Sequence, residues 1–376
     1  MNRQKQPHIL MLNKAYPPWV GGIERHVCDV SEELVRRGWR VSVLVCHEGR
    51  QATHEESNRV HVYRCPRWAT VLSQPIVTGY LKKIKALQPD LVHVHLPFPL
   101  GWLAPGWIDA KVPVVCTWHS DIVRQAFLRP FFAPLERWFL RRCARILPTS
   151  EPLRAGTVAL WDFEEKCQVI PLAIHATPPP NEAERASVQA IRLRWPGKIV
   201  LFVGRLVSYK GLAYLINAMA QVEGHLLLAG DGALREPLET LAGETARDRI
   251  HFLGPVSEEE KLALYRAADV FVLPSVERNE AFGYVLLEAM QEGCPVISTA
   301  LPTGVCYVNQ HEETGLVVPP RDAVALARAI QRILFEVGLR DRLSLQARER
   351  IQTEFSFPHV MDQVEAVYRE CLGSMG

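Results

Sequence analysis

The sequence predicts an α/β protein with two doubly wound domains. Short apolar runs alternate with longer helical segments along nearly the whole chain, a pattern typical of parallel sheets with helices on both faces. The 376 residues exceed what one ordinary core requires. Three consecutive prolines near the middle, within 176–181, indicate an extended linker between two alternating halves.

The first half contains a regular series of predicted strands. They span 8–12, 41–46, 60–65, 91–95, 114–118, 146–149 and 168–170. Between the first two strands, Ile23, Val27, Val30 and Leu34 recur every three or four residues. This spacing predicts an amphipathic helix over 22–37.

The second half repeats the alternation. Its predicted strands span 199–203, 225–229, 250–253, 270–273, 296–298 and 316–318, with helices over 213–222 and 258–267 and a terminal helix over 358–371. We therefore divide the chain into a domain over 1–176, a second over 177–355 and a terminal helix over 356–376. In open sheets of this class ligands bind beyond the carboxyl ends of the strands, so candidate residues should directly follow strands.

Composition restricts the class of protein. The nine cysteines include no C-x-x-C pair, which argues against a zinc site or a disulfide framework and favours buried free thiols. The sequence lacks a stretch of 18 apolar residues and a signal-like leader, so we expect a cytoplasmic protein. Residues 1–178 hold 23 Lys/Arg against 15 Asp/Glu, whereas the remainder holds 20 against 26. This asymmetry either gives the two halves different partners or reflects solvated surfaces.

Two candidate positions follow strands in the first half. Gly21 and Gly22 lie between the first strand and the first helix, where a bare backbone and free N–H groups suit an anion, although an ordinary turn is the simpler interpretation. His119 ends a strand within a polar cluster, as a site residue or a structural histidine. His93 and His95 share one strand face, but without a nearby third ligand we expect structural histidines and no metal site.

In the second half, Gly204 and Arg205 follow a strand and Lys210 comes five residues later. Two fixed cations beside a glycine loop suit a diphosphate and can neutralise a departing nucleoside diphosphate, the role Mg²⁺ plays elsewhere. No D-x-D pair is present to hold such a metal. A surface Arg and Lys in a turn is the alternative.

The sharpest signal lies over 280–288. Glu280 precedes Gly283, where a helix is expected to begin, and Glu288 falls inside that helix after an apolar stretch. Carboxylates near a buried helix start are costly unless they accept hydrogen bonds. Sugar and ribose hydroxyls are suitable donors.

Together these motifs resemble the retaining glycosyltransferases of family 4 over nearly the whole chain and in the expected order. The E-x₇-E motif is Glu280 to Glu288, the G-R-L…K-G motif is Gly204–Leu206 with Lys210–Gly211, and His119 and Gly21–Gly22 match the family histidine and double glycine. The resemblance implies the GT-B fold, in which two Rossmann-like domains face a central cleft. It also implies that the terminal helix crosses back to the first domain.

The resemblance implies roles for the site residues. Arg205 and Lys210, beside Gly204, would hold the donor diphosphate. Glu280 and the backbone of Phe282 and Gly283 would contact the transferred sugar. Glu288 would bind the donor ribose, and His119 would lie near the reaction centre. Gly21 and Gly22 would border the phosphates and the acceptor. The anomeric configuration would be retained, with no metal and no cofactor besides the nucleotide-sugar donor.

Two segments depart from the family pattern and indicate a subgroup. Ala173 and His175 replace a usual glycine and aspartate, and 301–308 lacks the commoner double-glycine loop. The segments 118–125 and 308–311 resemble bacterial O-antigen and exopolysaccharide enzymes, many of them mannosyltransferases. The resemblance therefore suggests GDP-mannose as donor and a lipid-linked or oligosaccharide acceptor.

The segment 124–145 holds six arginines and one acid, interleaved with Phe127, Phe131, Phe132, Trp138 and Phe139. This combination suits the anionic inner face of the cytoplasmic membrane, although the aromatics would also serve a domain core. No nucleic-acid-binding motif is present.

Four other functions would use many of the same sequence features. They are a glycosyltransferase that uses a UDP-sugar, a nucleotide-sugar epimerase on the same fold, a non-catalytic sugar-nucleotide-binding subunit and an NAD-dependent oxidoreductase. The absence of G-x-G-x-x-G argues against the last of these.

Overall fold

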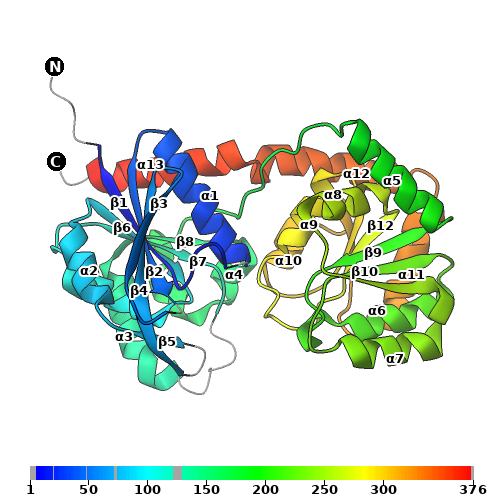
Figure 1. Ribbon diagram of the computed structural model, residues 1–376, viewed down its shortest axis with the longest axis horizontal. Coiled ribbons are helices and arrows are strands. Elements are labelled where there is room, and N and C mark those ends of the chain that lie inside the picture. Colours follow the sequence, from blue (N-terminus) through cyan, green and yellow to red (C-terminus); the bar gives the residue numbers. More distant parts are fainter. Residues whose placement is uncertain (1–5, 20, 48, 72–73, 122–128, 374–376) are drawn as a thin grey trace. The chain divides into compact units, whose positions relative to one another are not determined.

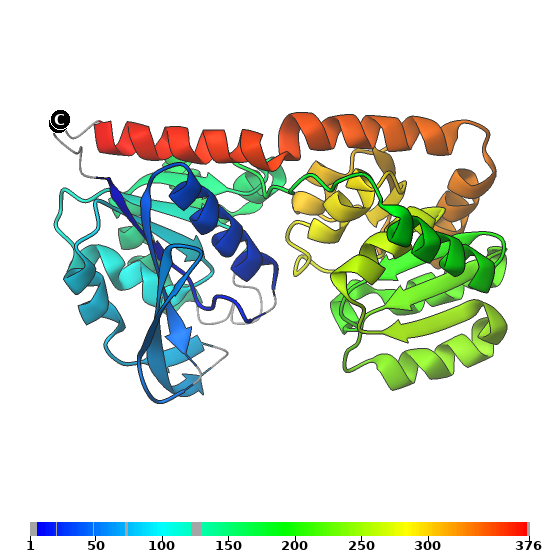
Figure 2. The same ribbon diagram turned by 45° about the horizontal axis from the view of Figure 1, so that its top comes forward.

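The computed structural model describes residues 6–19, 21–47, 49–71, 74–121 and 129–373. The chain divides into two units. Unit 1 comprises Met1–Leu172 with Pro358–Gly376, and unit 2 comprises Ala173–Phe357. Within each unit a central sheet carries helices on both faces (Figures 1 and 2).

Unit 1 is built on one mainly parallel sheet. Its strands are β1 (His8–Leu12), β2 (Arg40–His47), β3 (Thr53–Ser57), β4 (Val60–Val71), β5 (Gln74–Val77), β6 (Leu91–Leu96), β7 (Val114–Trp118) and β8 (Cys143–Pro148). The order is β3-β4-β2-β1-β6-β7-β8, and only β3 and β5 among these described strands run antiparallel to their partner, β4. Its helices are α1 (Gly22–Arg36), α2 (Tyr80–Leu87), α3 (Arg129–Arg142), α4 (Glu151–Gly156) and α13 (Phe357–Gly373), with 3₁₀ helices η1 (Pro99–Trp107) and η3 (Val158–Lys166).

The two faces of this sheet have different chemistry because side chains alternate along each strand. On β6, Val92 and Val94 enter an apolar core with α2, η1 and α3. His93 and His95 therefore point to the opposite face, where α1 and α13 lie. Trp39, just before β2, anchors α13 by donating a hydrogen bond from Nε1 to Glu365 Oε1 at 3.0 Å.

Unit 2 contains a second, parallel sheet. Its strands are β9 (Ile199–Val203), β10 (His225–Ala229), β11 (Ile250–Gly254), β12 (Val270–Leu273), β13 (Val296–Thr299) and β14 (Gly315–Val318), in the order β11-β10-β9-β12-β13-β14. Its α-helices are α5 (Glu182–Arg194), α6 (Leu212–Ala218), α7 (Arg235–Thr245), α8 (Glu258–Ala267), α9 (Tyr284–Gln291), α10 (Gly304–Val308), α11 (Ala323–Phe335) and α12 (Leu339–Arg350). Short helical turns are η4 (Ser208–Lys210), η5 (Met219–Gln221), η6 (Arg247–Arg249) and the π-helical η7 (Ile351–Phe355). Helices α5, α8 and α9 cover one face and α6 and α7 the other (Figure 1).

Each sheet has a topological switch point where the chain changes direction of winding. It lies between β1 and β6 in unit 1 and between β9 and β12 in unit 2. The loops that leave these strands are the places where doubly wound sheets bind ligands. They hold most of the residues singled out from the sequence.

The predicted class of two parallel-sheet α/β domains is confirmed, with local corrections. The strand predicted over 168–170 is wrong, because only an isolated bridge from Cys167 to Ile146 forms there. The helix predicted over 213–222 is divided into α6 and η5. The antiparallel strands β3 and β5 were not predicted, because exposed polar residues over 53–57 show no apolar alternation. Within the described ranges, none of the helices has both the length and the apolar content needed to cross a bilayer.

Candidate active site

The switch point of unit 2 brings the β9 and β12 loops together. Gly204 and Arg205 directly follow β9, and Ser275 lies two residues after β12. Gly211 joins the two loops: it adopts φ +67°, and a Cβ there would lie 2.2 Å from the Pro274 carbonyl oxygen. Only a residue without a side chain fits this approach, which places the preceding Lys210 beside the β12 loop.

Lys210 and Glu280 form a buried ion pair at this edge. Lys210 Nζ lies 2.5 Å from Glu280 Oε2, and Ser275 Oγ donates to the same oxygen at 3.0 Å. The exposed fractions are 7% for Lys210 and 9% for Glu280. Both contacts fall on Oε2, so within the described residues Oε1 of Glu280 has no protein partner and remains able to accept a hydrogen bond.

Arg205 occupies a different environment from Lys210. Its side chain is exposed, and NH2 donates to the Tyr209 hydroxyl at 3.2 Å. The unit therefore presents one exposed and one buried cation on the same loop. This arrangement suits an anion with two phosphate groups.

Glu288 lies in α9, whose N-cap is Gly283 at φ +78°. Its carboxylate accepts from Lys261 Nζ at 2.8 Å and from the Tyr265 hydroxyl at 3.0 Å. Burial and the neighbouring Glu288 raise the pKa of Tyr265 well above its usual range, so its hydroxyl stays protonated and donates. A carboxylate has about four acceptor positions, so Glu288 retains capacity for a further donor.

Phe282 fixes the backbone between the two glutamates. Its buried ring packs edge-to-face on Phe355, with centroids 6.2 Å apart. On one side of it, the amide of Gly304 donates to the Ala281 carbonyl at 2.7 Å. The backbone over 281–283 is thereby held against the start of α10.

In unit 1, His119 belongs to a cluster of buried imidazoles. His119 Nε2 lies 3.1 Å from His95 Nδ1, and His95 Nε2 lies 3.4 Å from the sulfur of Met11. His26, from α1, meets both rings edge-on, with centroids 5.8 Å from His95 and 5.3 Å from His119. His119 Nδ1 is buried and has no hydrogen-bond partner among the described residues.

Burial keeps these imidazoles neutral. It lowers the pKa of His26 to about 4 and the pKa of His93 to about 3, and it holds the pKa values of His95 and His119 well below the ordinary range. His93 is a structural member, because Nδ1 lies 2.5 Å from the Tyr368 hydroxyl and Nε2 lies 2.8 Å from Thr117 Oγ1.

His26, His95 and His119 each offer a nitrogen within 4.8 Å of the others. Neutral imidazoles are a donor set that a transition metal accepts. In this cluster, however, His95 Nδ1 and His119 Nε2 are hydrogen-bonded to each other, so neither nitrogen is free to bind a metal while that bond is made. His26 could not be assigned to this cluster from the sequence, because α1 brings it to the strands from a distant part of the chain.

Gly21 and Gly22 form the start of α1. Gly21 is the N-cap, with extended backbone and no side-chain cap, and a Cβ on Gly22 would meet open space. Free N–H groups at the start of a 15-residue helix attract an anion. The neighbouring Val20 lies outside the described residues.

The basic and aromatic segment divides between core and surface. Phe139 is fully buried, whereas Phe131 is 79% exposed, Phe132 44% and Trp138 39%. Arg124 and Phe127 lie outside the described residues. Phe139 therefore belongs to the domain core, whereas Phe131, Phe132 and Trp138 lie at the surface of unit 1.

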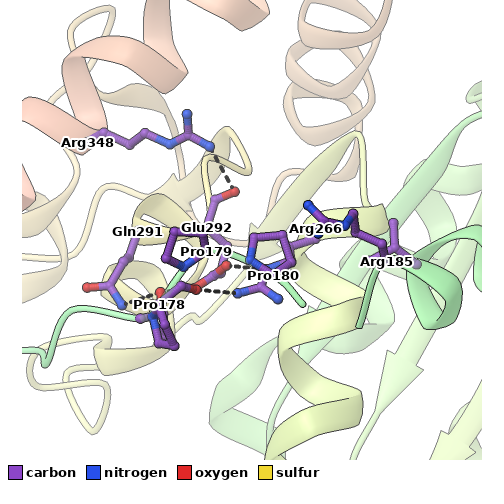
Figure 3. A pocket seen from close by; sticks show the side chains of 10 residues that line it. Pro178, Pro179, Pro180, Arg185, Arg266, Gln291, Glu292 and Arg348 are labelled. Carbon is purple, nitrogen blue, oxygen red and sulfur yellow. Dashed lines mark hydrogen bonds and ion pairs between the residues drawn. The ribbon is translucent and has the colours of Figure 1, made fainter. Parts of the chain in front are cut away.

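A separate pocket of about 400 Å³ lies at the linker of unit 2, and Figure 3 shows its lining. Arg266 pairs with Glu292 at 2.6 Å and with Glu184 at 3.1 Å. Gln291 Nε2 donates to the His175 carbonyl at 2.8 Å. These contacts bind the linker to α8 and α9, so the pocket lies within a structural network.

The structure thus brings Lys210 and Glu280 into contact, while Arg205 and Glu288 make separate contacts within unit 2. Sequence reasoning missed Ser275, Lys261, Tyr265 and Met11, and it took His95 for a structural histidine. Ser275 was detectable, because it lies two residues after the strand predicted over 270–273. The others carry no motif and become partners only through folding.

The fold defines a class: two Rossmann-like parallel-sheet domains, as in the GT-B glycosyltransferases. Residues 185–350 match the family model for glycosyl transferases group 1, and residues 20–177 match the model for glycosyltransferase family 4. The chain therefore belongs to these glycosyltransferases.

Individual relatives agree with this assignment. The chain is 28% identical over 363 residues to the O-antigen chain mannosyltransferase C of Escherichia coli, covering 96% of this chain and 97% of the relative. It is 35% identical over 246 residues to the D-rhamnosyltransferase WbpZ of Pseudomonas aeruginosa, covering 65% and 64%. Among solved structures, sucrose-phosphate synthase from Thermosynechococcus elongatus superposes with a TM-score of 0.77 at 27% identity, covering 98% and 100%.

Proposed function

We propose that this glycosyltransferase is a retaining hexosyltransferase that transfers mannose from GDP-mannose to a lipid-linked saccharide in cell-surface polysaccharide biosynthesis. The similarity to an O-antigen mannosyltransferase along nearly the whole length of both chains supports the donor and the pathway class. The observation that carries the proposal is the ion pair of Lys210 and Glu280 at the β9 and β12 switch point.

Unit 2 is proposed to take the donor. Arg205 and Lys210 bind the diphosphate, and their positive charge stabilises the nucleoside diphosphate as it leaves. Glu280 accepts hydrogen bonds from the hexose through Oε1, beside the backbone of Phe282 and Gly283. Glu288 accepts from the ribose hydroxyls.

Unit 1 is proposed to take the acceptor. Gly21 and Gly22 offer the N-terminus of α1 to the phosphate groups, and His119 contacts the transferred sugar. A saccharide acceptor on a lipid carrier places the enzyme at the cytoplasmic membrane surface. The exposed Phe131, Phe132 and Trp138 are the proposed membrane contact.

The proposed reaction proceeds on one face of the sugar. The acceptor oxygen forms a bond to the anomeric carbon as the bond from that carbon to the diphosphate oxygen breaks. Because the acceptor attacks the face that the diphosphate leaves, the configuration is retained. The acceptor proton passes to the departing diphosphate oxygen, so no protein base is needed. Arg205 and Lys210 supply the charge that would otherwise come from a divalent ion, so we propose that no metal is required.

A donor panel tests this proposal. Apparent stability is measured with GDP, GDP-mannose, GDP-D-rhamnose, UDP, UDP-glucose, ADP and NAD, with and without EDTA. A ligand at a hundredfold excess over its Kd stabilises the folded state by about 2.7 kcal/mol. We expect stabilisation by GDP and GDP-mannose that survives EDTA, and release of GDP with retained configuration in the product.

Other outcomes lead elsewhere. Stabilisation by UDP compounds alone would agree with a glycosyltransferase but would exclude GDP-mannose as its donor. A response to GDP-D-rhamnose with none to GDP-mannose would reassign the sugar. Interconversion of the free nucleotide sugar without acceptor would indicate an epimerase, and a response to NAD alone would discard the proposal.

A further inference from the structure

Met11, His95 and His119 form a linear series of contacts in unit 1. The sulfur of Met11 lies 3.4 Å from His95 Nε2, and His95 Nδ1 lies 3.1 Å from His119 Nε2. All three side chains are almost completely buried, with exposed fractions of 0%, 1% and 3%. Solvent therefore does not compete for these contacts.

The first contact sets the direction of the second. A thioether sulfur carries no hydrogen and only accepts. His95 Nε2 is consequently the N–H that donates to Met11, and in a neutral imidazole the other nitrogen then holds a lone pair. His95 Nδ1 accepts, so the proton of the second contact belongs to His119 Nε2. In neutral His119 this leaves Nδ1 without a proton.

His119 Nδ1 is also the atom that the protein leaves unsatisfied. It is buried and has no partner among the described residues. A buried polar atom without a partner costs free energy, and such atoms in native proteins call for an explanation such as a ligand. An unprotonated nitrogen is satisfied by a ligand that donates a hydrogen bond.

The surrounding rings hold this arrangement in place. His26 meets both imidazoles edge-on. His93 lies against the His95 ring with centroids 4.3 Å apart, and its own nitrogens are taken by Tyr368 and Thr117. His93 therefore offers no competing partner to His95, and burial disfavours the charged form of every ring in the cluster.

We propose that Met11 and His95 are positioning residues that fix His119 as the tautomer with an unprotonated Nδ1, which accepts a hydrogen bond from a sugar hydroxyl. This inference rests on the proposed function for the identity of the ligand, but the tautomer itself does not. His119 then recognises a hydroxyl as a donor group, and it neither protonates the sugar nor polarises it.

The tautomer is tested on the full chain without ligand by long-range ¹H–¹⁵N correlation spectra of the histidines near pH 7. His119 is assigned with the His119→Gln variant. We expect an unprotonated Nδ1 and a protonated Nε2. A proton on Nδ1 of His119 or a doubly protonated His119 ring would overturn the proposal. So would a tightly bound metal ion that alters the signals of His26, His95 and His119.

The role of Met11 is tested with Met11→Leu, which conserves volume but removes the sulfur acceptor. We expect the Leu variant to show a mixture of His119 tautomers. Met361→Leu, at an equally buried methionine in α13, is the control for the loss of a buried sulfur and should leave the tautomer unchanged. An unchanged single tautomer in Met11→Leu would overturn the role of Met11.

Analogues of the donor test the ligand contact. GDP release is measured with GDP-mannose and with analogues in which the 2-, 3-, 4- or 6-hydroxyl is replaced by fluorine, which accepts but cannot donate. Fluorine also slows transfer by withdrawing electrons from the reacting carbon, so each analogue is compared with GDP-mannose in the wild type and in Met11→Leu. For one analogue, the slowing relative to GDP-mannose should be roughly three- to tenfold greater in the wild type than in Met11→Leu. The same relative slowing of every analogue in the wild type and in Met11→Leu would overturn the acceptor role. No turnover of GDP-mannose itself would overturn the proposed function and leave the tautomer result intact.

Discussion

Lys210 Nζ lies 2.5 Å from Glu280 Oε2, although 70 residues separate them in the chain. The contact forms because β9 and β12 are neighbours in the sheet, so that the loop after β9 and the loop before α9 meet at one edge. Breaking a buried pair by removing one partner typically costs 3–5 kcal/mol, because the remaining charge is uncompensated. The pair therefore fixes the cation before any donor binds.

Replacement of Glu280 should abolish transfer. Glu280→Ala removes both the partner of Lys210 and the proposed acceptor for hexose hydroxyls, so we expect GDP release to fall by about 100-fold or more. Glu280→Gln keeps the size of the side chain and separates loss of charge from loss of packing. Folding is checked by circular dichroism and thermal unfolding. Glu277→Gln, in the same loop, is the matched control and should stay near wild type.

A folded Glu280→Gln variant with nearly normal transfer would remove Glu280 from the mechanism. Lys210→Met provides a second test. It should weaken GDP binding, whereas Glu280→Gln can impair transfer without weakening GDP binding. If both variants instead unfold, the pair is chiefly structural.

Glu288 should affect donor binding more than the chemical step. Glu288→Gln weakens hydrogen bonds to a charged acceptor, typically worth about 1.5–3 kcal/mol, so the Kd for GDP should rise by roughly 10- to 150-fold. Calorimetric titration with GDP measures it. Glu258→Gln, which removes the other carboxylate beside Lys261, is the control. An unchanged Kd for both variants would contradict the ribose role.

Much of the fold could be predicted because it depends on local pattern. Strands such as 199–203 and 270–273 are continuous apolar runs, and the structure places β9 and β12 at these residues. The antiparallel β3 could not be predicted, because its exposed residues, Thr53–Ser57, pair with β4 through the backbone. Backbone pairing leaves no mark in side-chain periodicity.

The candidate site shows the same division. Glu280 and Glu288 stand out by spacing within one loop and helix. Lys261 and Tyr265 reach Glu288 from α8, and Met11 reaches His95 from a neighbouring strand. Such partners depend on which helices and strands lie side by side, and that arrangement is a property of the packed sheet.

The histidine cluster should make unit 1 sensitive to acid. An unfolded histidine has a pKa of about 6.5, whereas burial lowers the pKa of His26 to about 4 and that of His93 to about 3. At pH values between the folded and unfolded pKa of each histidine, the unfolded state binds more protons than the folded state. Stability is therefore complete above pH 6.5 and declines as the pH falls toward 4, by up to about 1.4 kcal/mol per pH unit for each histidine.

Urea unfolding at a series of pH values from 7 to 4 measures this decline. His93→Gln should lower stability at pH 7 and make the dependence on pH shallower by close to one proton. A midpoint that does not change over this range would show that the rings are protonated in the folded protein.

The exposed aromatics of α3 should contribute to membrane binding. Phe131 and Phe132 are exposed in α3, which also carries the exposed Arg141 and Arg137, the latter paired with Asp162. One helix therefore offers apolar and cationic groups to an anionic bilayer. We expect the protein to cosediment with vesicles that contain phosphatidylglycerol, and binding should weaken as salt screens the charges. The double variant Phe131→Ser with Phe132→Ser should bind less. Phe335→Ser changes a similarly exposed phenylalanine of α11 in unit 2 and should bind as the wild type does. Equal binding to neutral and anionic vesicles would contradict this prediction. So would an equal loss of binding in the Phe131/Phe132 double variant and in Phe335→Ser, because α3 would then contribute no more than α11.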